Sequence, residues 1–567
     1  MRILHIDTPR SLTTTVKPFD FDAAAYLDSF DIAYDSIDIN ICFWQFILGK
    51  VGSSLDIQEY LFYPGIDSAS IQELDRALQV IITELNIPLS PFGFLFDDYI
   101  VTSTIGIQEL CKSFSGFEII HEFVESRLKP VLYTSEIPDL ISFGIDSNQS
   151  LVFAALFATA LRNFLPAQVK LGIGKHNYEN FSLTFWREKL EEAQNLNSIF
   201  DFILYEEEYC QQSLVKLCDC STIPHNRGEI PQGSKNHQKQ DFCTRMAAYK
   251  TLIDRSHYQE FWCINPKKIV YLMPLSRNKC YWKKCTFCVQ INKHIADSFY
   301  SEESEIKIAL ASIQAVYDLG IRYIIFNDEA ATPKNVAVLC QFLEAEHIQD
   351  LSWTVRIIAD TNFGDLLIER MAKMGCREVL FGLETVLPST AQRMGKVSSS
   401  ESEEEILSLL GQFGHRGIGI FLNLIYAFPT EPDTDFLTSF QFYQRAKSQI
   451  PGITVQFNKF ALFNGSKIFR SPEQYGVTII PPEAECDLQL VFDYVDRFGR
   501  HYSDPPNQDY FLESLEMDKA ELDTVDDYFL ELLFQINYAS FGFIYKSQTN
   551  QNLMRYVLTD YKNGKLS

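Results

Sequence analysis

Three cysteines stand close together in the segment KCYWKKCTFC, with four residues between the first two and two between the last two. They are Cys280, Cys285 and Cys288, and Lys283 and Lys284 lie between the first two. Thiolates at such spacing are typical ligands of iron and zinc. The rest of the 13 cysteines are scattered along the chain, which favours a metal site in a reducing compartment over a framework of disulfides.

Two metal centres fit this set of thiolates. Three thiolates within nine residues can ligate three irons of a [4Fe–4S] cluster and leave the fourth iron open to bind a small molecule. The two lysines would then offset part of the negative charge of the thiolates. The alternative is a zinc ion, with His294 as its fourth ligand. The spacing of the thiolates alone leaves both metal centres open.

Alternating strands and helices begin at Lys268, just before the cysteines. Apolar runs predict six strands, separated by amphipathic helices. The predicted strands are Ile269–Leu272, Tyr323–Asn327, Ser352–Ile357, Glu378–Gly382, Gly419–Ala427 and Thr454–Phe460. They predict an α/β fold, a partial TIM-like (β/α)6 barrel over residues 267–478, with the active site at the carboxyl ends of its strands. The cysteines follow the first strand and so belong to that end.

The N-terminal region, residues 1–210, predicts a second α/β unit. Strand and helix patterns alternate through Leu140–Gly144, Ser150–Asn163, Gln168–Leu171 and Phe202–Tyr205, with Gly172 and Gly174 in a loop. This βαβ pattern predicts an open, Rossmann-like parallel sheet. Residues 211–266 are polar and predict a linker, and residues 479–567 predict a mainly helical region that packs over the barrel, with a clear helical pattern from Thr524.

The cysteine segment resembles that of the radical S-adenosylmethionine (SAM) superfamily, whose usual spacing is C-x3-C-x2-C; this chain has one residue more in the first interval. The resemblance implies that the cluster cleaves SAM to a 5′-deoxyadenosyl radical, which removes hydrogen from a substrate C–H bond. It implies that Phe287 packs near the adenine. It also implies SAM contacts at the strand ends FNDEA, WTVRI, FGLET and AFPTEP, namely Asp328, Glu329, Arg356, Glu384, Pro429 and Glu431.

The order of the two domains resembles the cobalamin-binding branch of the same superfamily. Its glycine-rich loops are altered here: one segment contains Gly174 and His176, and the other has three glutamates, 206–208, in place of glycines. The chain also lacks a D-x-H-x-x-G segment for a histidine ligand to cobalt. We expect the domain to keep its fold, and we regard cobalamin as possible but disfavoured, because three carboxylates would repel its phosphate-bearing tail.

The segment GSKIFRSPEQYGV resembles one in radical SAM enzymes that mature ribosomally made peptides (RiPPs). The resemblance implies a peptide precursor as substrate, an electron donor such as flavodoxin or ferredoxin, and epimerisation as the reaction. Cys486 would then donate the returning hydrogen, because Cys376 precedes its strand and Cys340 lies in a helix pattern. The alternatives are a cobalamin-dependent C-methyltransferase acting on a peptide or small molecule, and a non-catalytic iron–sulfur or zinc protein.

Charge and hydropathy bear on partners and location. The chain has 49 Lys and Arg against 74 Asp and Glu, a net charge of −25, which disfavours a nucleic-acid partner. The apolar run LVFAALFATAL stops at Arg162, short of the roughly 18 residues expected of a membrane span. The N-terminus predicts a strand and not a signal peptide, so we expect a cytoplasmic protein without a membrane partner.

Overall fold

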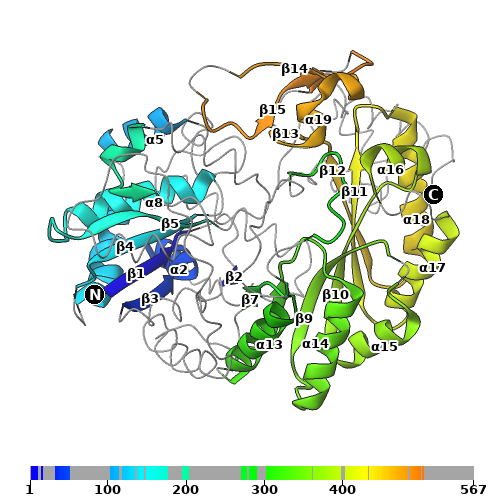
Figure 1. Ribbon diagram of the computed structural model, residues 1–567, viewed down its shortest axis with the longest axis horizontal. Coiled ribbons are helices and arrows are strands. Elements are labelled where there is room, and N and C mark those ends of the chain that lie inside the picture. The colour runs from blue at the N-terminus through cyan, green and yellow to red at the C-terminus, as the bar shows by residue number, and fades with distance from the viewer. Residues whose placement is uncertain are drawn as a thin grey trace, which may run out of the picture.

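The computed structural model of the 567-residue chain has two α/β halves, shown side by side in Figure 1. The structure describes residues 2–9, 15–16, 32–50, 103–113, 118–133, 137–145, 148–176, 194–203, 270–276, 280–289, 302–318, 320–360, 362–396, 402–431, 433–482, 486–499 and 501–502. Predictions for His294, for glutamates 206–208, for the linker 211–266 and for the helix from Thr524 lie outside these residues.

The N-terminal half contains a parallel sheet in the order β3-β1-β4-β5-β6. Its strands are β1 (Arg2–Asp7), β3 (Ala33–Asp38), β4 (Leu140–Ile145), β5 (Lys170–His176) and β6 (Phe202–Ile203). The predicted open parallel sheet is therefore confirmed, with chain order 2-1-3-4-5. One detail was wrong: Gly172 and Gly174 lie within β5 and not in a loop. A Cβ atom on Gly172 would collide with the backbone of Phe202, so this close approach of β6 requires glycine.

Helix α8 (Asn148–Arg162) supplies much of the core of this half. Strand β4 reads LISFGI and is buried at every position, which is typical of a parallel strand covered on both faces. Phe153 and Phe157 of α8 pack edge-to-face against Phe43 of α2 (Asn40–Lys50). Phe123 of α6 (Glu118–Phe123) joins them. The cluster holds the helices against the sheet. Helix α5 (Thr104–Ser113), the π-helical turn Val124–Leu128, α7 (Lys129–Tyr133) and the 3-10 helix Gln194–Ser198 complete the described helices of this half.

The second half contains a parallel sheet in the order β12-β11-β10-β9-β8-β7-β2. Six strands occupy the predicted positions: β7 (Val270–Met273), β8 (Tyr323–Phe326), β9 (Ser352–Ile358), β10 (Cys376–Glu384), β11 (Gly419–Tyr426) and β12 (Ile453–Lys459). They follow each other in space as they do in sequence, which a barrel requires. Closure of the barrel itself stays a prediction, because β12 and β2 are the two edges of the sheet.

Strand β2 (Thr15–Val16) comes from the N-terminal region but pairs with Val270 and Tyr271 of β7. The predicted domain boundary at residue 210 separates β2 from β7, so this pairing of the two strands was not expected. The two halves of the chain therefore share a sheet edge.

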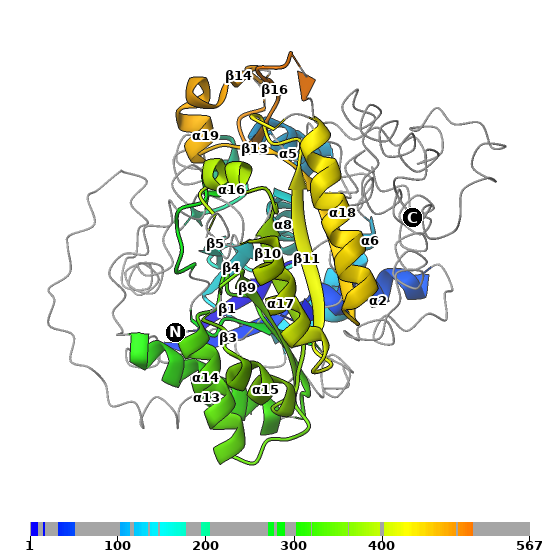
Figure 2. The same cartoon turned by 90° about the vertical axis from the view of Figure 1, so that its right-hand side faces the viewer.

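Helices cover the second sheet (Figure 2). They are α13 (Glu302–Asp318), α14 (Pro333–Ala345), α15 (Asp365–Lys373), α16 (Pro388–Met394), α17 (Glu403–Gly414) and α18 (Asp433–Gln449). Helices α15, α17 and α18 contact β10, β11 and β12 respectively. Helix α17 begins at a capping box, in which Ser402 and Glu405 bond each other's backbone amides.

Short elements follow the second sheet and lie above both halves in Figure 1. They are β13 (Leu462–Phe463), α19 (Lys467–Arg470), the 3-10 helix Pro472–Tyr475, β14 (Thr478–Ile479), β15 (Val491–Phe492), β16 (Tyr494–Val495) and β17 (His501–Tyr502). Strand β13 pairs with β15, and β16 pairs with β14 and β17. The described part of the predicted helical region, up to residue 502, is thus formed by antiparallel strands.

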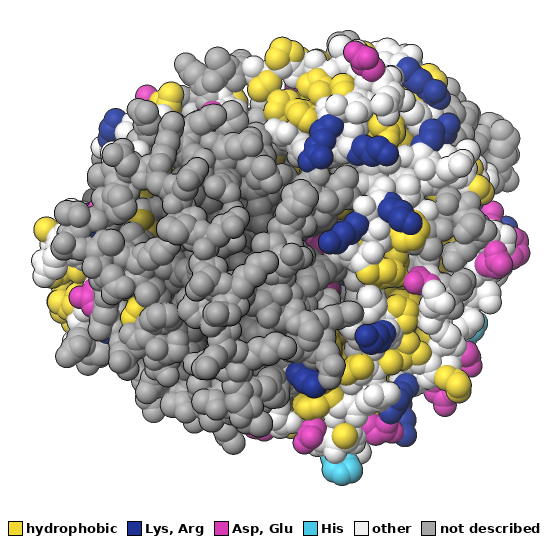
Figure 3. Space-filling view, viewed as in Figure 1, with side chains coloured by type: hydrophobic (Ala, Val, Ile, Leu, Met, Phe, Trp, Pro, Cys, Tyr) yellow, Lys and Arg dark blue, Asp and Glu magenta, His cyan; other side chains and the backbone are white. Residues whose placement is uncertain are grey.

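Across the described residues, every helix is too short or too polar to cross a membrane. Figure 3 shows Lys and Arg side chains on one face of the second half, although the whole chain has a net charge of −25. Asp and Glu side chains lie on the same part of the surface, mostly toward its rim (Figure 3).

Candidate functional site

The cysteine loop follows β7 and rests on the end of α16. Cys280 forms a parallel bridge with Ala330, beyond the end of β8. The Thr286 amide donates to Met394 O at 2.8 Å, and Trp282 Nε1 donates to Gly395 O at 2.6 Å. The loop is therefore held at the carboxyl ends of the strands, where the sequence predicted it.

Gly395 allows this contact. Its φ of +72° is left-handed, and a Cβ atom there would collide with Lys284 O. The Thr286 hydroxyl adds a third bond, to Arg393 O at 3.0 Å. Residues 393–395 thus form the support of the cysteine loop.

Lys396 is a buried cation beside this support, with 4% of its side chain exposed. Its Nζ donates to Glu384 Oε1 at 3.3 Å. Burial lowers the pKa of Lys396, but the negative charge of Glu384, and of Cys285 and Cys280 where they are ionised, acts more strongly in the other direction, so the pKa is raised overall. Lys396 is therefore a fixed positive charge near the cysteines.

Sequence reasoning assigned the compensating charge to Lys283 and Lys284. The structure leaves both exposed and places Lys284 Nζ 4.3 Å from the centre of the Trp282 ring. The segment MGK could have identified Lys396 in the sequence. Its Met and Gly are apolar, and its lysine lies twelve residues after Glu384.

The three cysteines suit an iron–sulfur cluster by their chemistry. Each is partly exposed. Burial raises the pKa of Cys285 to about 11, with Lys396 lowering it and Glu384 and Cys280 raising it, so a metal ion that binds this sulfur has to displace a proton. In the described part of the chain, no three His, Cys, Asp or Glu side chains converge as a ready metal site. The three thiols are therefore suitable ligands for an iron–sulfur cluster by their chemistry, although they do not converge on one point in this structure.

The acidic pair after β8 divides into two roles. Asp328 is fully buried and accepts bonds from the amides of Leu275 at 2.5 Å and Ser276 at 2.7 Å. Burial raises its pKa, which these bonds partly oppose. Asp328 thus fixes the start of the cysteine loop. Glu329 instead accepts from Arg356 Nη1 of β9 at 3.2 Å, so the structure brings these two predicted SAM contacts together.

Glu384 and Glu431 occupy strained turns at two strand ends. Glu384 ends β10 with a φ of +68°, at a shift in the pairing of β10 with β11. After β11, Ala427 has a φ of +59°, and the buried Glu431 accepts from the Phe428 amide at 3.3 Å. Strain of this kind is concentrated at functional sites. Pro429 is buried in the second turn, and Phe287 packs against the core from the cysteine loop.

The three isolated cysteines lie in different places. Cys376 begins β10, at the end opposite to the site, and Cys340 is buried in α14. Burial raises the pKa of Cys340 to about 12, and it also raises the pKa of Cys376 well above the usual value of a thiol. Cys486 is partly exposed and starts the segment that reaches the N-terminal half. Its predicted role as a hydrogen donor stays a prediction.

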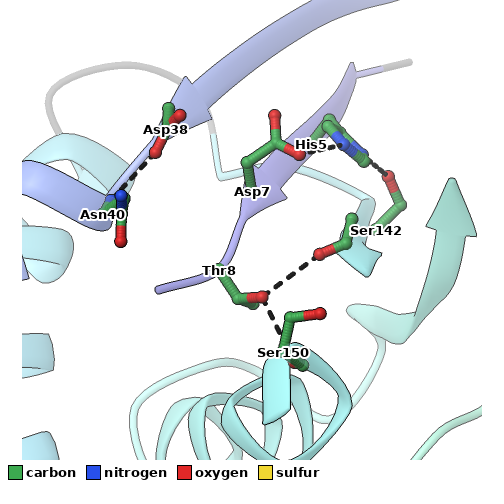
Figure 4. Close-up of polar contacts among 8 residues, drawn as sticks. His5, Asp7, Thr8, Asp38, Asn40, Ser142 and Ser150 are labelled. Atoms are coloured by element: carbon green, nitrogen blue, oxygen red, sulfur yellow. Dashed lines mark hydrogen bonds and ion pairs between the residues drawn. The ribbon is translucent and has the colours of Figure 1, made fainter. Parts of the chain in front are cut away.

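A second polar site lies at the carboxyl end of the N-terminal sheet (Figure 4). In an open sheet of order 2-1-3-4-5, ligands bind where the strand order reverses, here between β1 and β4. His5 Nδ1 bonds Ser142 Oγ at 2.7 Å. Among the described residues the buried Nε2 has no hydrogen-bond partner, and it lies 3.7 Å from Asp7 Oδ1. A Cβ atom on Gly144 would collide with both side chains.

The loop beyond this point is closed by Thr8. Its hydroxyl bonds the carbonyls of Gly144 and Ser150, each at 3.2 Å (Figure 4). The edge is therefore polar and built from small residues, which fits a polar ligand. Sequence reasoning looked for this site around His176, whose side chain lies outside the described residues, and did not consider β1.

Comparisons with known proteins agree with this two-part architecture. No family model matches the chain. An uncharacterized methyltransferase of Pyrococcus horikoshii is 26% identical over 130 residues, which is 23% of this chain and only 28% of that protein. The structure of the radical SAM methyltransferase TsrM from Kitasatospora setae, with cobalamin and a [4Fe–4S] cluster bound, matches with a TM-score of 0.50 and 10% identity. That match covers 98% of this chain and 99% of TsrM.

The cobalamin-dependent radical SAM enzyme OxsB gives a TM-score of 0.49 at 11% identity, over 100% of this chain and 81% of OxsB. At 10% identity the likeness to TsrM concerns the fold alone. The order of the halves and the cysteine loop predicted that fold from the sequence. The chain has the fold of the radical SAM enzymes that carry a cobalamin-binding domain.

Proposed function

We propose that this chain is a cobalamin-dependent radical SAM methyltransferase. The observation that carries the proposal is the fold shared with TsrM over nearly the whole of both chains, together with the cysteine loop at the end of β7. The 130-residue similarity to a methyltransferase supports the same reaction class. These findings favour methylation, the alternative in the sequence analysis, over epimerisation. They also favour cobalamin, which the sequence had disfavoured.

Two cofactors would be held by residues already described. Cys280, Cys285 and Cys288 would hold a [4Fe–4S] cluster, and the edge at Asp7 and Thr8 would lie beside a corrinoid. When bound, the cluster supplies an electron to SAM and the corrinoid supplies a methyl carrier.

The chain's own residues would bind SAM. Glu329 holds the guanidinium of Arg356 at the strand ends, which keeps a cation ready for the SAM carboxylate. Glu384 would lie near the ribose. Glu431 and Pro429 would close over the adenine in the turn after β11. A peptide precursor as substrate and a flavodoxin or ferredoxin as electron donor stay predictions.

Anaerobic purification with hydroxocobalamin present tests the proposal. We expect about one corrinoid per chain by its visible absorption, and about four irons per chain. A variant with alanine at all three cysteines of the loop is the matched control, because it should lose the iron and keep the corrinoid. With SAM labelled in its methyl group, the label should appear in the product.

A protein that binds no corrinoid contradicts the proposal. Turnover that places solvent deuterium at a peptide α-carbon and stops in Cys486→Ala would instead establish the epimerase.

A further inference from the structure

Residues 486–497, which we call the strap, contact both halves of the chain. The first contact is made by Asp487, whose Oδ1 accepts from the Thr104 amide at 2.8 Å and whose Oδ2 accepts from the Thr104 hydroxyl at 2.6 Å. Asn148 Nδ2 donates to Leu488 O at 3.3 Å. Leu488 itself is fully buried.

These contacts lie at the carboxyl end of the N-terminal sheet. Thr104 and Asn148 are the first residues of α5 and α8, so the strap bonds two helix N-termini. Helix α8 directly follows β4, which places its first residue at the carboxyl end of that strand. Asp487 thus caps α5 from 383 residues away along the chain.

The other end of the strap is fixed to the carboxyl end of the second sheet. Strand β15 of the strap pairs with β13, which follows β12, and Asn464 N donates to Leu490 O at 2.8 Å. Arg497 Nη2 donates to Thr430 O at 2.7 Å. Thr430 lies in the turn after β11 and precedes Glu431, a predicted SAM contact.

We propose that the strap fixes the spacing of the two sheets, carboxyl end toward carboxyl end, with Asp487 as the positioning residue. Asp487 follows the second sheet in the chain, yet it accepts hydrogen bonds at the N-terminus of α5 in the first half. This contact orients the two halves relative to each other. If the proposed function holds, the same spacing separates the methyl carrier from the bound SAM and substrate. The strap itself does not depend on that function.

Hydrogen exchange and X-ray scattering of the full chain test the strap without substrate or cofactor. In Asp487→Ala, amides in the first turn of α5 should exchange about tenfold faster, as expected for a lost cap, and the radius of gyration should increase. Asp487→Asn keeps an acceptor for Thr104 and should behave as the unaltered chain. Asp350→Ala is the matched control, because it removes an equal charge from a pair with Arg322 on the second half, outside the strap.

Three results would overturn the proposal. In one, Asp487→Ala changes neither exchange nor scattering. In another, exchange rises in α5 while scattering stays the same, which means that Asp487 is only a local cap. In the third, Asp350→Ala produces the same changes. If Asp487→Ala does not fold, Thr104→Ala takes its place. It removes the hydrogen bond from the Thr104 hydroxyl to Asp487, and exchange and scattering are measured in the same way.

Discussion

Replacing Glu384 with glutamine should leave a buried lysine without its carboxylate. The side chains of Lys396 and Glu384 are 4% and 14% exposed, and their charged atoms are 3.3 Å apart. Removing one member of a buried ion pair costs about 3–5 kcal/mol. The thiol of Cys285, with a pKa of about 11, is neutral at pH 7 and cannot take over. Because Glu384 is slightly exposed, we expect a loss of about 3 kcal/mol.

Urea unfolding of the iron-free full chain at pH 7 measures this loss. Because an unfolding unit as large as the second half has an m-value of about 3 kcal/mol per M, the urea concentration at the unfolding midpoint should fall by about 1 M. The double variant Glu384→Gln/Lys396→Met removes both charges and should recover most of the stability. Glu344→Gln is the control, because it breaks an exposed pair with Arg370 and should hardly move the midpoint.

An unchanged urea midpoint in Glu384→Gln would show that the pair of Lys396 and Glu384 does not stabilise the fold. A double variant that is no more stable than the single one would show that the loss comes from the glutamate itself and not from the unpaired lysine.

Three further outcomes are expected. Alanine at all three cysteines of the loop should abolish SAM cleavage as well as iron binding, and retained cleavage would refute the cluster. Glu431→Ala should weaken SAM binding by about 1–3 kcal/mol with iron content unchanged; equal affinity by calorimetry would remove the turn after β11 from the SAM site. Burial raises the pKa of Glu378 to about 7, so the stability that its proton gives is complete below the unfolded pKa and lost as pH rises through 7. Glu378→Gln should therefore be more stable than the unaltered chain at pH 8, by about 3 kcal/mol, and equally stable at pH 4; a difference independent of pH would contradict this.

The sequence predicted the six strands of the second sheet because each is an apolar run bounded by turns. It also placed the cysteine loop, since three thiolates in one loop form a local pattern. Lys396 was missed because its closeness to the cysteines is not local in the sequence: Trp282 and Gly395, which join the loop to its support, are 113 residues apart. Strands β13 to β17 were missed because each has two residues, too few to show a period of two.

The site at the N-terminal sheet was missed for another reason. His5 and Asp7 alternate with apolar residues in the first strand, a pattern that equally suits an ordinary edge strand. Only the pairing of β1 with β4, across 137 residues, shows that the two side chains face Ser142 and Gly144 where the strand order reverses.

Strand β2 has a consequence for how the protein is made. Thr15 and Val16 cover the outer edge of β7, so the second half is complete only after a residue pair from the extreme N-terminal region has joined it. In a shortened chain that begins after residue 210, β7 would lose β2 from its outer edge, and a strand edge without its partner recruits strands from other molecules. Shortened at that point, the second half should aggregate, and a synthetic peptide that spans residues 10–20 should compete for the same edge.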